Sequence, residues 1–156
     1  NVEDPTVNDL EDIGTIAKIV KLIKMPDGGT TVIIQGMKRF KITSVISEDP
    51  FFKAMIEVLQ EAQTPDDENF RAQAVSIKDL ASQIIQLSPN IPSEAAIILK
   101  NIENPSFLIH FVSNNLNATI VEKQQLLETQ NISHRAELLL TLLQKELQFA
   151  ELKNQV

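Results

Sequence analysis

The feature that most constrains this fold is a short turn, MPDGG over residues 25–29, which lies between two apolar runs with strand character. Apolar and polar residues alternate over residues 13–24, and β-branched residues crowd residues 30–35. Proline presets φ at the start of the turn, and Gly28 can adopt the positive φ that closes a hairpin with a bulge. The turn therefore predicts an antiparallel β-hairpin. A phosphate-binding loop is the alternative for these glycines, but neither a helix start nor a Gly-Lys-Ser/Thr sequence follows them.

The rest of the β region is predicted from breaks and alternation. We expect Gly36 to end the second strand, so that residues 38–47 form a third strand. Residues 51–59 follow an Asp-Pro turn and are expected to form a fourth strand. Apolar residues on both faces of residues 13–24 indicate burial on both sides, at least in part. Gly14 indicates a bulge or a close approach of the backbone to a neighbour.

Beyond residue 61 the sequence becomes helical in character. Apolar residues at helical spacing predict helices over residues 65–87, 93–102, 106–116 and 120–128, and a last helix that runs to the end of the chain. The expected N-terminal caps are Thr64 before Pro65, Asn104 before Pro105, Thr119 with Glu122, and Asn131 or Ser133. The expected apolar face of the third helix consists of Phe107, Leu108, Phe111 and Val112.

These elements predict an α+β fold. An acidic lead-in covers residues 1–12 and is expected to be a loop or disordered. A small antiparallel β subdomain covers residues 13–62, and an all-helical bundle that ends in a long helix covers residues 63–156. The chain of 156 residues is long enough for one large domain or two small ones.

Charge and composition exclude several classes of function. The net charge of −7 argues against binding to nucleic-acid backbones or anionic membranes, which require clustered Lys and Arg. There is no cysteine, which excludes disulfides, thiol catalysis and thiolate metal sites. No apolar run reaches the roughly 20 residues that span a bilayer. We therefore expect neither nucleic acid nor membrane among the partners.

No catalytic constellation is found in the sequence. His110 lies among apolar residues and is expected to be a partly buried packing residue, and His134 is expected to be solvated. Residues 66–68 are acidic but lie in a predicted first helical turn, which favours capping over metal binding. No G-x-S-x-G or Walker motif is present. The basic cluster of Lys38, Arg39 and Lys41 is interpreted as solvated residues of a sheet face, with contact to an acidic partner as the alternative.

Several segments together resemble the N-terminal domain of bacterial ATP-dependent Lon proteases. They are, in order, Ile13 to Ile19, Met25 to Gly28, Val32 to Gly36 with Arg39 and Ile42, Ile91-Pro92, Asn104-Pro105, Glu122 to Glu128, and Arg135, Leu139, Leu143, Glu146 and Leu147. The resemblance is collinear from Leu10 to the C-terminus. Two departures are an extra Gly29 at the hairpin and Met25 in place of the usual Leu. The family's opening strands, its ATPase module and its Ser-Lys peptidase are expected to be missing from this piece.

The resemblance implies a pseudo-barrel-like sheet before the helical bundle, and a non-catalytic role in substrate recognition and oligomerisation. The implied parent is a bacterial cytoplasmic ATP-dependent serine protease that forms hexamers and degrades misfolded and regulatory proteins. ATP and Mg²⁺ are expected only in the absent ATPase module, so no cofactor, metal or catalytic residue is assigned here. The alternative is a stand-alone binding module or adaptor without an ATPase. An enzyme in its own right would need a nucleophile or metal constellation.

The mechanism expected for such a module is contact between exposed apolar side chains and unfolded or damaged protein substrates. The candidate contact residues are Met25, Pro26, Met37, Phe51 and Phe52. Ordinary core or turn packing is the alternative for each of them. Without the opening strands, a strand edge and apolar surface would be left uncovered, so we also expect self-association.

Overall fold

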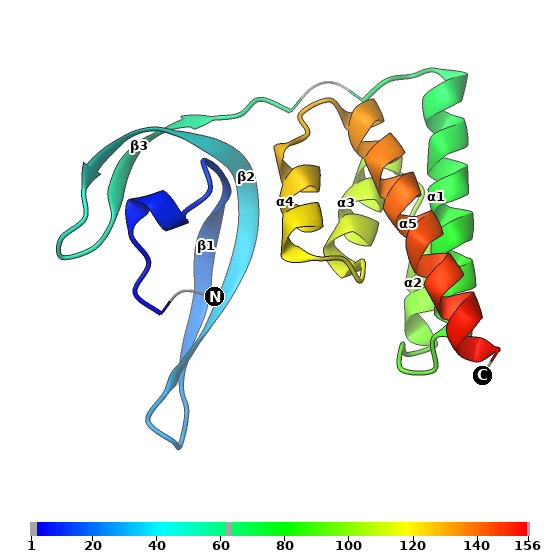
Figure 1. Cartoon of the computed structure of the whole chain (residues 1–156), viewed down its shortest axis with the longest axis horizontal. Coiled ribbons are helices and arrows are strands. Elements are labelled where there is room, and N and C mark those ends of the chain that lie inside the picture. Colours follow the sequence, from blue (N-terminus) through cyan, green and yellow to red (C-terminus); the bar gives the residue numbers. More distant parts are fainter. Residues whose placement is uncertain (1–2, 62–63, 156) are drawn as a thin grey trace. The chain divides into compact units, whose positions relative to one another are not determined.

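The computed structural model describes residues 3–61 and 64–155, and it confirms the predicted α+β class (Figure 1). Residues 1–2 of the predicted lead-in, residues 62–63 of the connector, and Val156 lie outside the described residues. Two compact units make up the chain, residues 1–61 and residues 62–156. We call them the β unit and the helical unit and describe each by itself.

The lead-in contains local structure where a loop or disorder was predicted. A 3-10 helix covers Val7–Asp9. The carboxylate of Asp9 accepts a hydrogen bond of 2.8 Å from the backbone N–H of Thr6, and this bond stabilises the first turn.

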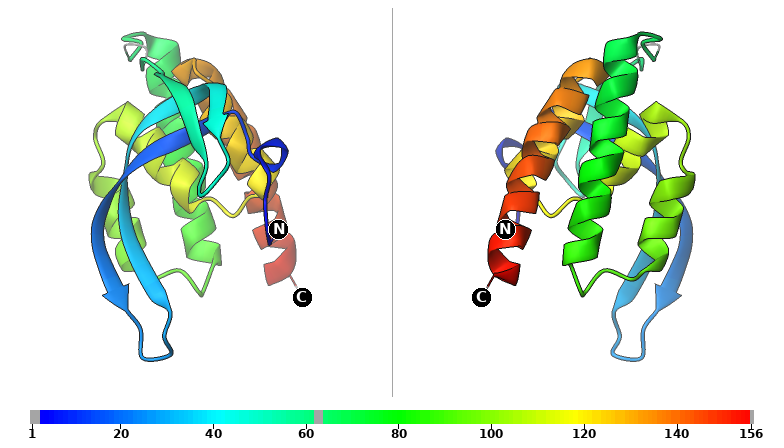
Figure 2. Two further views of the ribbon diagram at one scale, coloured as in Figure 1. Left: turned by 90° about the vertical axis from the view of Figure 1, so that its left-hand side faces the viewer. Right: turned by 90° about the vertical axis from the view of Figure 1, so that its right-hand side faces the viewer.

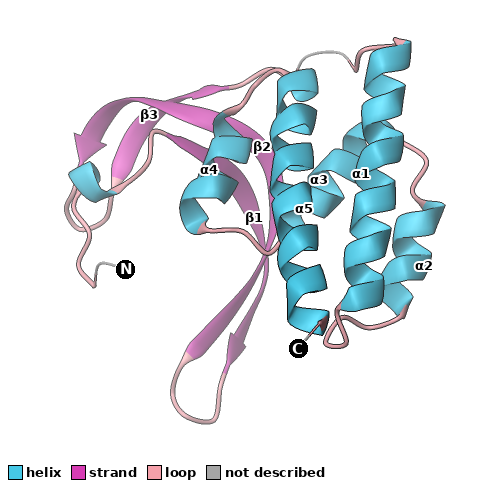
Figure 3. Ribbon diagram, turned by 45° about the vertical axis from the view of Figure 1, so that its right-hand side comes forward, coloured by secondary structure: helices cyan, strands magenta, loops and turns pink. Residues whose placement is uncertain are grey.

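In the β unit, a three-stranded antiparallel sheet has the order β1-β2-β3 (Figures 1 and 3). β1 (Ile13–Lys24) and β2 (Thr30–Ser47) form the predicted hairpin. Gly28 has a φ of 89°, and the turn is closed by a 2.8 Å bond from the Met25 N–H to the Gly29 carbonyl. The turn chemistry read from the sequence is therefore confirmed.

The prediction that Gly36 ends a strand is wrong. β2 continues through Gly36 without a break. Ala17 pairs with Gly36 and Ile16 pairs with Lys38, so Met37 is the extra residue of a β-bulge. The bulge absorbs the irregularity that was interpreted as a break between two strands. The segment is consequently one long, curved strand (Figure 1).

β3 (Lys53–Val58) begins two residues later than predicted. Phe51 and Phe52 therefore lie in the connection before β3 rather than in its ladder. The predicted close approach at Gly14 is confirmed. A Cβ atom at this position would lie 2.8 Å from Cζ of the Phe40 ring, which is the residue paired with Gly14 across the sheet. A side chain at position 14 would therefore force the Phe40 ring to shift.

The helical unit contains α1 (Glu68–Leu87), α2 (Glu94–Asn101), α3 (Pro105–Asn115), α4 (Ile120–Glu128) and α5 (Ile132–Asn154). α1 and α5 lie side by side and run in the same direction (Figures 2 and 3). Their C-terminal ends are joined by a 3.1 Å bond from the Asn154 side-chain amide to the Leu87 carbonyl. The core is apolar, and its fully buried large side chains are Phe70, Ile77, Leu99, Ile109, Leu139 and Leu143.

Most helix caps follow the sequence signals. Asn104 and Asn131 accept hydrogen bonds from the first-turn amides of α3 and α5, and Thr119 and Glu122 form the capping box of α4. The start of α1 differs from the prediction. Its cap is Asp67, which accepts a 2.7 Å bond from the Phe70 N–H, while the Thr64 hydroxyl is hydrogen-bonded to that of Ser106. An aspartate preceding the apolar stripe is the better cap here because its carboxylate reaches the amide of a buried residue.

The apolar face of α3 is rotated relative to the prediction. Ile109 is completely buried and Phe107 is 57% exposed. Leu108 and Val112 lie in the core as expected, and with Ile109 they form a stripe at helical spacing. Phe107 instead stacks on Phe111, with their ring centroids 6.4 Å apart.

Ile109→Ala should therefore destabilise the helical unit by about 2–5 kcal/mol, because it opens a cavity in a fully packed core. Phe107→Ala, on the same helix, should cost less than about 1 kcal/mol. Urea unfolding followed by circular dichroism at the helix band measures both free energies. Equal losses for the two variants would contradict the observed rotation of α3.

Gly28→Val should destabilise the hairpin by about 1–2 kcal/mol, because a β-branched residue is strained at positive φ. Gly28→Asn is the matched control, since asparagine tolerates this conformation and should cost less. Hydrogen exchange at the Met25 amide, which closes the turn, reports the opening free energy. If both variants exchange at the wild-type rate, the conformation of the turn does not limit the stability of the hairpin.

Candidate functional site

No side chains assemble into a catalytic or metal centre within residues 3–61 and 64–155. No group of three or more His, Asp or Glu side chains is placed to hold a metal ion in that part of the chain. His110 is exposed on α3, so its predicted partial burial is wrong, whereas His134 is solvated as expected. Among the acidic residues at the start of α1, Asp67 caps the helix and Asp66 pairs with Arg71 at 2.6 Å. These carboxylates therefore have structural roles.

The basic cluster on β2 is not a continuous solvated surface. Lys38 and Lys41 are exposed, but Arg39 is 7% exposed, and its Nε lies 2.7 Å from Oε1 of Glu61. The Arg39 carbonyl also accepts a 2.9 Å bond from the Leu59 N–H. Arg39 thus ties the segment after β3 to the middle of the sheet. The interpretation of all three residues as a solvated sheet face is wrong for Arg39.

Large apolar side chains are exposed along all three strands of the β unit, on a surface that we call the apolar surface. It comprises Ile19, Val20, Leu22, Met25, Val32, Ile33, Ile34, Met37, Val45, Ile46, Phe51, Phe52, Met55, Ile56 and Val58, each at least 40% exposed. In contrast, Arg39 is the only fully buried side chain among residues 3–61. Apolar area on this scale is uncommon in a free monomeric domain and indicates an interaction surface.

The predicted contact residues all belong to exposed positions of the β unit. Met25 and Pro26 form the hairpin tip, Met37 lies in the bulge at 62% exposure, and Phe51 and Phe52 precede β3. Phe51 is 60% exposed, and the Lys53 ammonium lies 5.0 Å from its ring centroid. The sheet register places the hairpin tip and the phenylalanine pair at opposite ends of β2. The five residues therefore do not form one cluster.

Most of the apolar surface was not predicted from the sequence. Apolar residues on both faces of β1 predict burial on both sides, at least in part, but Ile19, Val20 and Leu22 are all exposed. The alternation pattern shows that these positions favour apolar contacts. It does not show which part of the protein, or which partner, provides those contacts. In this unit, the described residues do not supply it.

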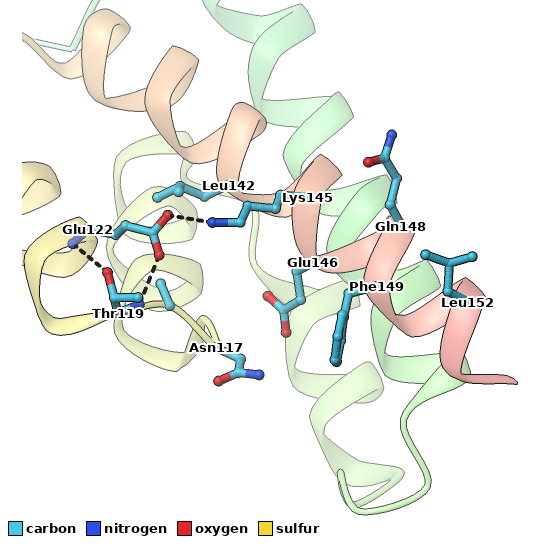
Figure 4. A pocket seen from close by; sticks show the side chains of 10 residues that line it. Asn117, Thr119, Glu122, Leu142, Lys145, Glu146, Gln148, Phe149 and Leu152 are labelled. Carbon is cyan, nitrogen blue, oxygen red and sulfur yellow. Dashed lines mark hydrogen bonds and ion pairs between the residues drawn. The ribbon is translucent and has the colours of Figure 1, made fainter.

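A separate feature of the helical unit is an open groove of about 490 Å³ between the C-terminal half of α5 and the segment joining α3 to α4 (Figure 4). Leu142, Phe149 and Leu152 of α5 form its apolar wall, and Ala118 faces them from the joining segment. Phe149 is 65% exposed. The volume lies in the range of sites that accept a small ligand or a few side chains.

The polar groups of the groove have two different environments. Glu122 lies 3.3 Å from the Lys145 ammonium and accepts a bond from the Thr119 N–H, and this bond above all lowers the pKa of its carboxyl. Burial raises the pKa of Glu146 above 4.5, although a backbone hydrogen bond from Asn117 and the charge of Lys123 partly oppose it. Glu146 thus carries a carboxylate in a half-buried place beside Phe149 (Figure 4).

The groove could have been found in the sequence as a second stripe on the last helix. Phe149 and Leu152 continue toward the C-terminus from Leu142 at helical spacing, beside the stripe that enters the core. Neither Phe149 nor Leu152 is among the contact residues predicted from the sequence. A second apolar stripe on one helix requires a second contact.

The exposed apolar side chains of the β unit give it the character of an interaction surface. The model of the ATP-dependent protease La (LON) substrate-binding domain matches residues 1–145. The chain therefore belongs to the Lon substrate-binding domain family, and the predicted resemblance is confirmed.

Curated relatives agree with this assignment. The chain is 50% identical over 155 residues to the Lon protease of Flavobacterium johnsoniae and 40% identical over 156 residues to that of Cytophaga hutchinsonii. Each alignment covers 99% of this chain but only 19% of the relative, at its N-terminal end. The chain thus spans about a fifth of the length of these relatives.

Solved structures show the same fold. The N-terminal domain of a Mycobacterium avium complex Lon protease superimposes with a TM-score of 0.73 at 23% identity, over 92% of this chain and 74% of that one. A Lon N-terminal domain protein from Xanthomonas campestris gives a TM-score of 0.61 at 14% identity, over 88% and 71%. In the described part of this chain, no helix combines the length and apolar character needed to cross a membrane.

Glu146→Gln should stabilise the helical unit at neutral pH. Because the folded pKa of Glu146 is raised above 4.5, the folded state holds a proton that the unfolded state has lost between these two values. Stability therefore falls as pH rises through this window, and above it the ionised carboxylate opposes folding. Glutamine keeps the hydrogen-bonding oxygen and removes the charge. After solvent screening of a half-exposed group, the gain should be about 1–2 °C in the unfolding midpoint.

Thermal unfolding at several pH values measures this effect. The stabilisation should be present at pH 7 and vanish below about pH 4, where Glu146 is protonated in both states. Glu151→Gln is the control, because Glu151 is exposed on the same helix outside the groove. A variant that is less stable than wild type at pH 7 would show that the attraction to Lys123 outweighs burial.

Proposed function

We propose that the chain captures unfolded segments of protein substrates on the apolar surface of its β unit. The observation that carries the proposal is the exposure of large apolar side chains along every strand of that unit. Unfolded and damaged proteins differ from folded ones by exposing apolar side chains. A surface that selects them needs apolar area rather than a polar code.

Two properties of the apolar surface suit substrates of varied sequence. It includes three methionines, Met25, Met37 and Met55, whose flexible side chains adapt to different partners. In addition, β1 and β3 each pair only with β2 among the described residues, which leaves outer strand edges. An extended segment can add to such an edge through its backbone, whatever its side chains. Both modes tolerate sequence variation.

The remaining parts of the proposal concern the whole protein, of which this chain corresponds to about a fifth in the relatives. We propose that the parent is an ATP-dependent serine protease of the bacterial cytoplasm. Its Ser-Lys peptidase and its ATP- and Mg²⁺-binding module would lie outside this chain, which would deliver substrates to them. The same exposed strands support a second role in self-association, and thus in assembly of a hexameric parent.

The test is a double variant, Met25→Glu and Phe51→Glu, that places charge at both ends of β2. Carboxylates there oppose burial of apolar substrate side chains, so the affinity for unfolded casein should fall at least about 10-fold. The matched control is Val75→Glu with Ile97→Glu, which changes two comparably exposed apolar residues of the helical unit. Fluorescence anisotropy of labelled casein gives both dissociation constants.

Wild-type affinity in the Met25/Phe51 double variant would overturn capture by the apolar surface. Light scattering on each protein measures self-association separately, because copies of the chain compete for the same surface. If the double variant loses self-association but retains casein binding, the surface serves assembly rather than substrate capture.

A further inference from the structure

The groove between α5 and the α3–α4 segment combines an apolar wall with a carboxylate that has no close cation. Lys145 approaches Glu122 at 3.3 Å. Within the described residues, Glu146 makes no ion pair within 4.0 Å; Lys123 attracts it only from a greater distance. Glu146 accepts a backbone hydrogen bond from Asn117, but a half-buried carboxylate with no cation beside it is costly, and a cation placed there would be favoured.

The apolar wall of the groove favours an apolar group of the ligand. Phe149 lies about two turns after Leu142 on α5 and Leu152 about one turn further, and Phe149 and Leu152 remain largely exposed. Covering them would remove apolar area from water at roughly 25 cal/mol per Å². Figure 4 shows Glu146 and Phe149 next to each other on the groove side of α5, while the Gln148 side chain extends away from them. A ligand that covers Phe149 therefore also reaches Glu146.

We infer that this groove binds a partner segment in which a large apolar side chain lies about one helical turn from a Lys or Arg. The apolar group covers Phe149 and Leu152, and the cation pairs with Glu146. The helical unit holds more carboxylates than cationic side chains, so its field also favours a cationic segment. The site is independent of the apolar surface proposed above for substrate capture, because it uses other residues in the other unit.

The probe is a nine-residue peptide with blocked ends that carries Phe and Lys four positions apart in a Ser/Ala background. Two counterparts replace its Lys by Glu or its Phe by Ala. Amide shifts in ¹H–¹⁵N spectra of the whole chain, recorded at pH 7 during titration, give both the site and the affinity. We expect shifts in residues 117–122 and 142–152, with weaker binding of both counterparts.

Glu146→Gln should lower the affinity for the Phe/Lys peptide about 5-fold, as expected for one partly exposed charge pair. The affinity for the Glu counterpart should not fall. Glu151→Gln is the matched charge control and should bind like wild type. Phe149→Ala should lower the affinity for every Phe-containing peptide. Phe107→Ala, which removes an exposed phenylalanine of α3, should leave these affinities unchanged. Both phenylalanines are more than half exposed, so the variants should fold.

Three results would overturn the inference. Shifts confined to the β unit would place the peptide on the apolar surface instead. If Glu146→Gln lowers the affinity for the Lys and Glu peptides equally, the Glu146 carboxylate does not pair with the cation of the peptide. A change in molar mass between wild type and Phe149→Ala by light scattering, without peptide binding, would assign the groove to a second copy of the chain. Casein capture by the β unit is measured separately, so its failure and this one are distinguishable.

Discussion

The packing of α1 against α5 is the interaction on which the helical unit depends. Phe70 and Ile77 of α1 and Leu139 and Leu143 of α5 are almost completely buried, and α2 and α3 contribute Leu99 and Ile109 to the same core. Because the two long helices run in the same direction, the chain must return between them, and α2, α3 and α4 make that connection. The short helices are therefore stabilised by the side chains that they bury in this core.

The β unit is stabilised differently. Its strands are joined by backbone ladders, by the turn at Gly28 and by the contact of Phe40 with Gly14, while Arg39 fixes the segment after β3 through Glu61. Few apolar side chains are shielded from water within the unit. Three strands with one hydrophobic face can be stable, but here apolar groups remain in water on both faces. The apolar side chains that find no cover within the unit form the surface proposed to bind substrates.

Sequence reasoning succeeded where the signal is local. The MPDGG turn and the caps at Asn104, Thr119 and Asn131 each depend on residues within a few positions, so the sequence alone specifies them. It failed where the result depends on distant partners. Gly36 looks like a break, but pairing with Ala17 carries the strand through it.

The same reason explains the misassigned side chains. Either Phe107 or Ile109 could face the core on a helix rich in apolar residues, and only the neighbouring helices decide between them. Arg39 looks like one cation among three until Glu61, far along the chain, returns to it. The groove escaped prediction because it combines residues of α5 with the α3–α4 segment. The candidate residues at Met25, Met37 and Phe51 were exposed as proposed, but the wider apolar surface was not foreseen.

The two sites proposed here differ in chemistry, and together they would favour unfolded substrates for a reason beyond either affinity. An apolar surface alone accepts many sequences weakly, and the groove adds a requirement for a nearby cation. A single extended chain can occupy both, since each residue extends its reach by roughly 3.4 Å, and the second contact then gains from a high effective concentration. A folded protein that exposes one such segment satisfies only one site. Weak, separate sites therefore discriminate by the length of accessible chain, which is the property that distinguishes an unfolded protein from a folded one.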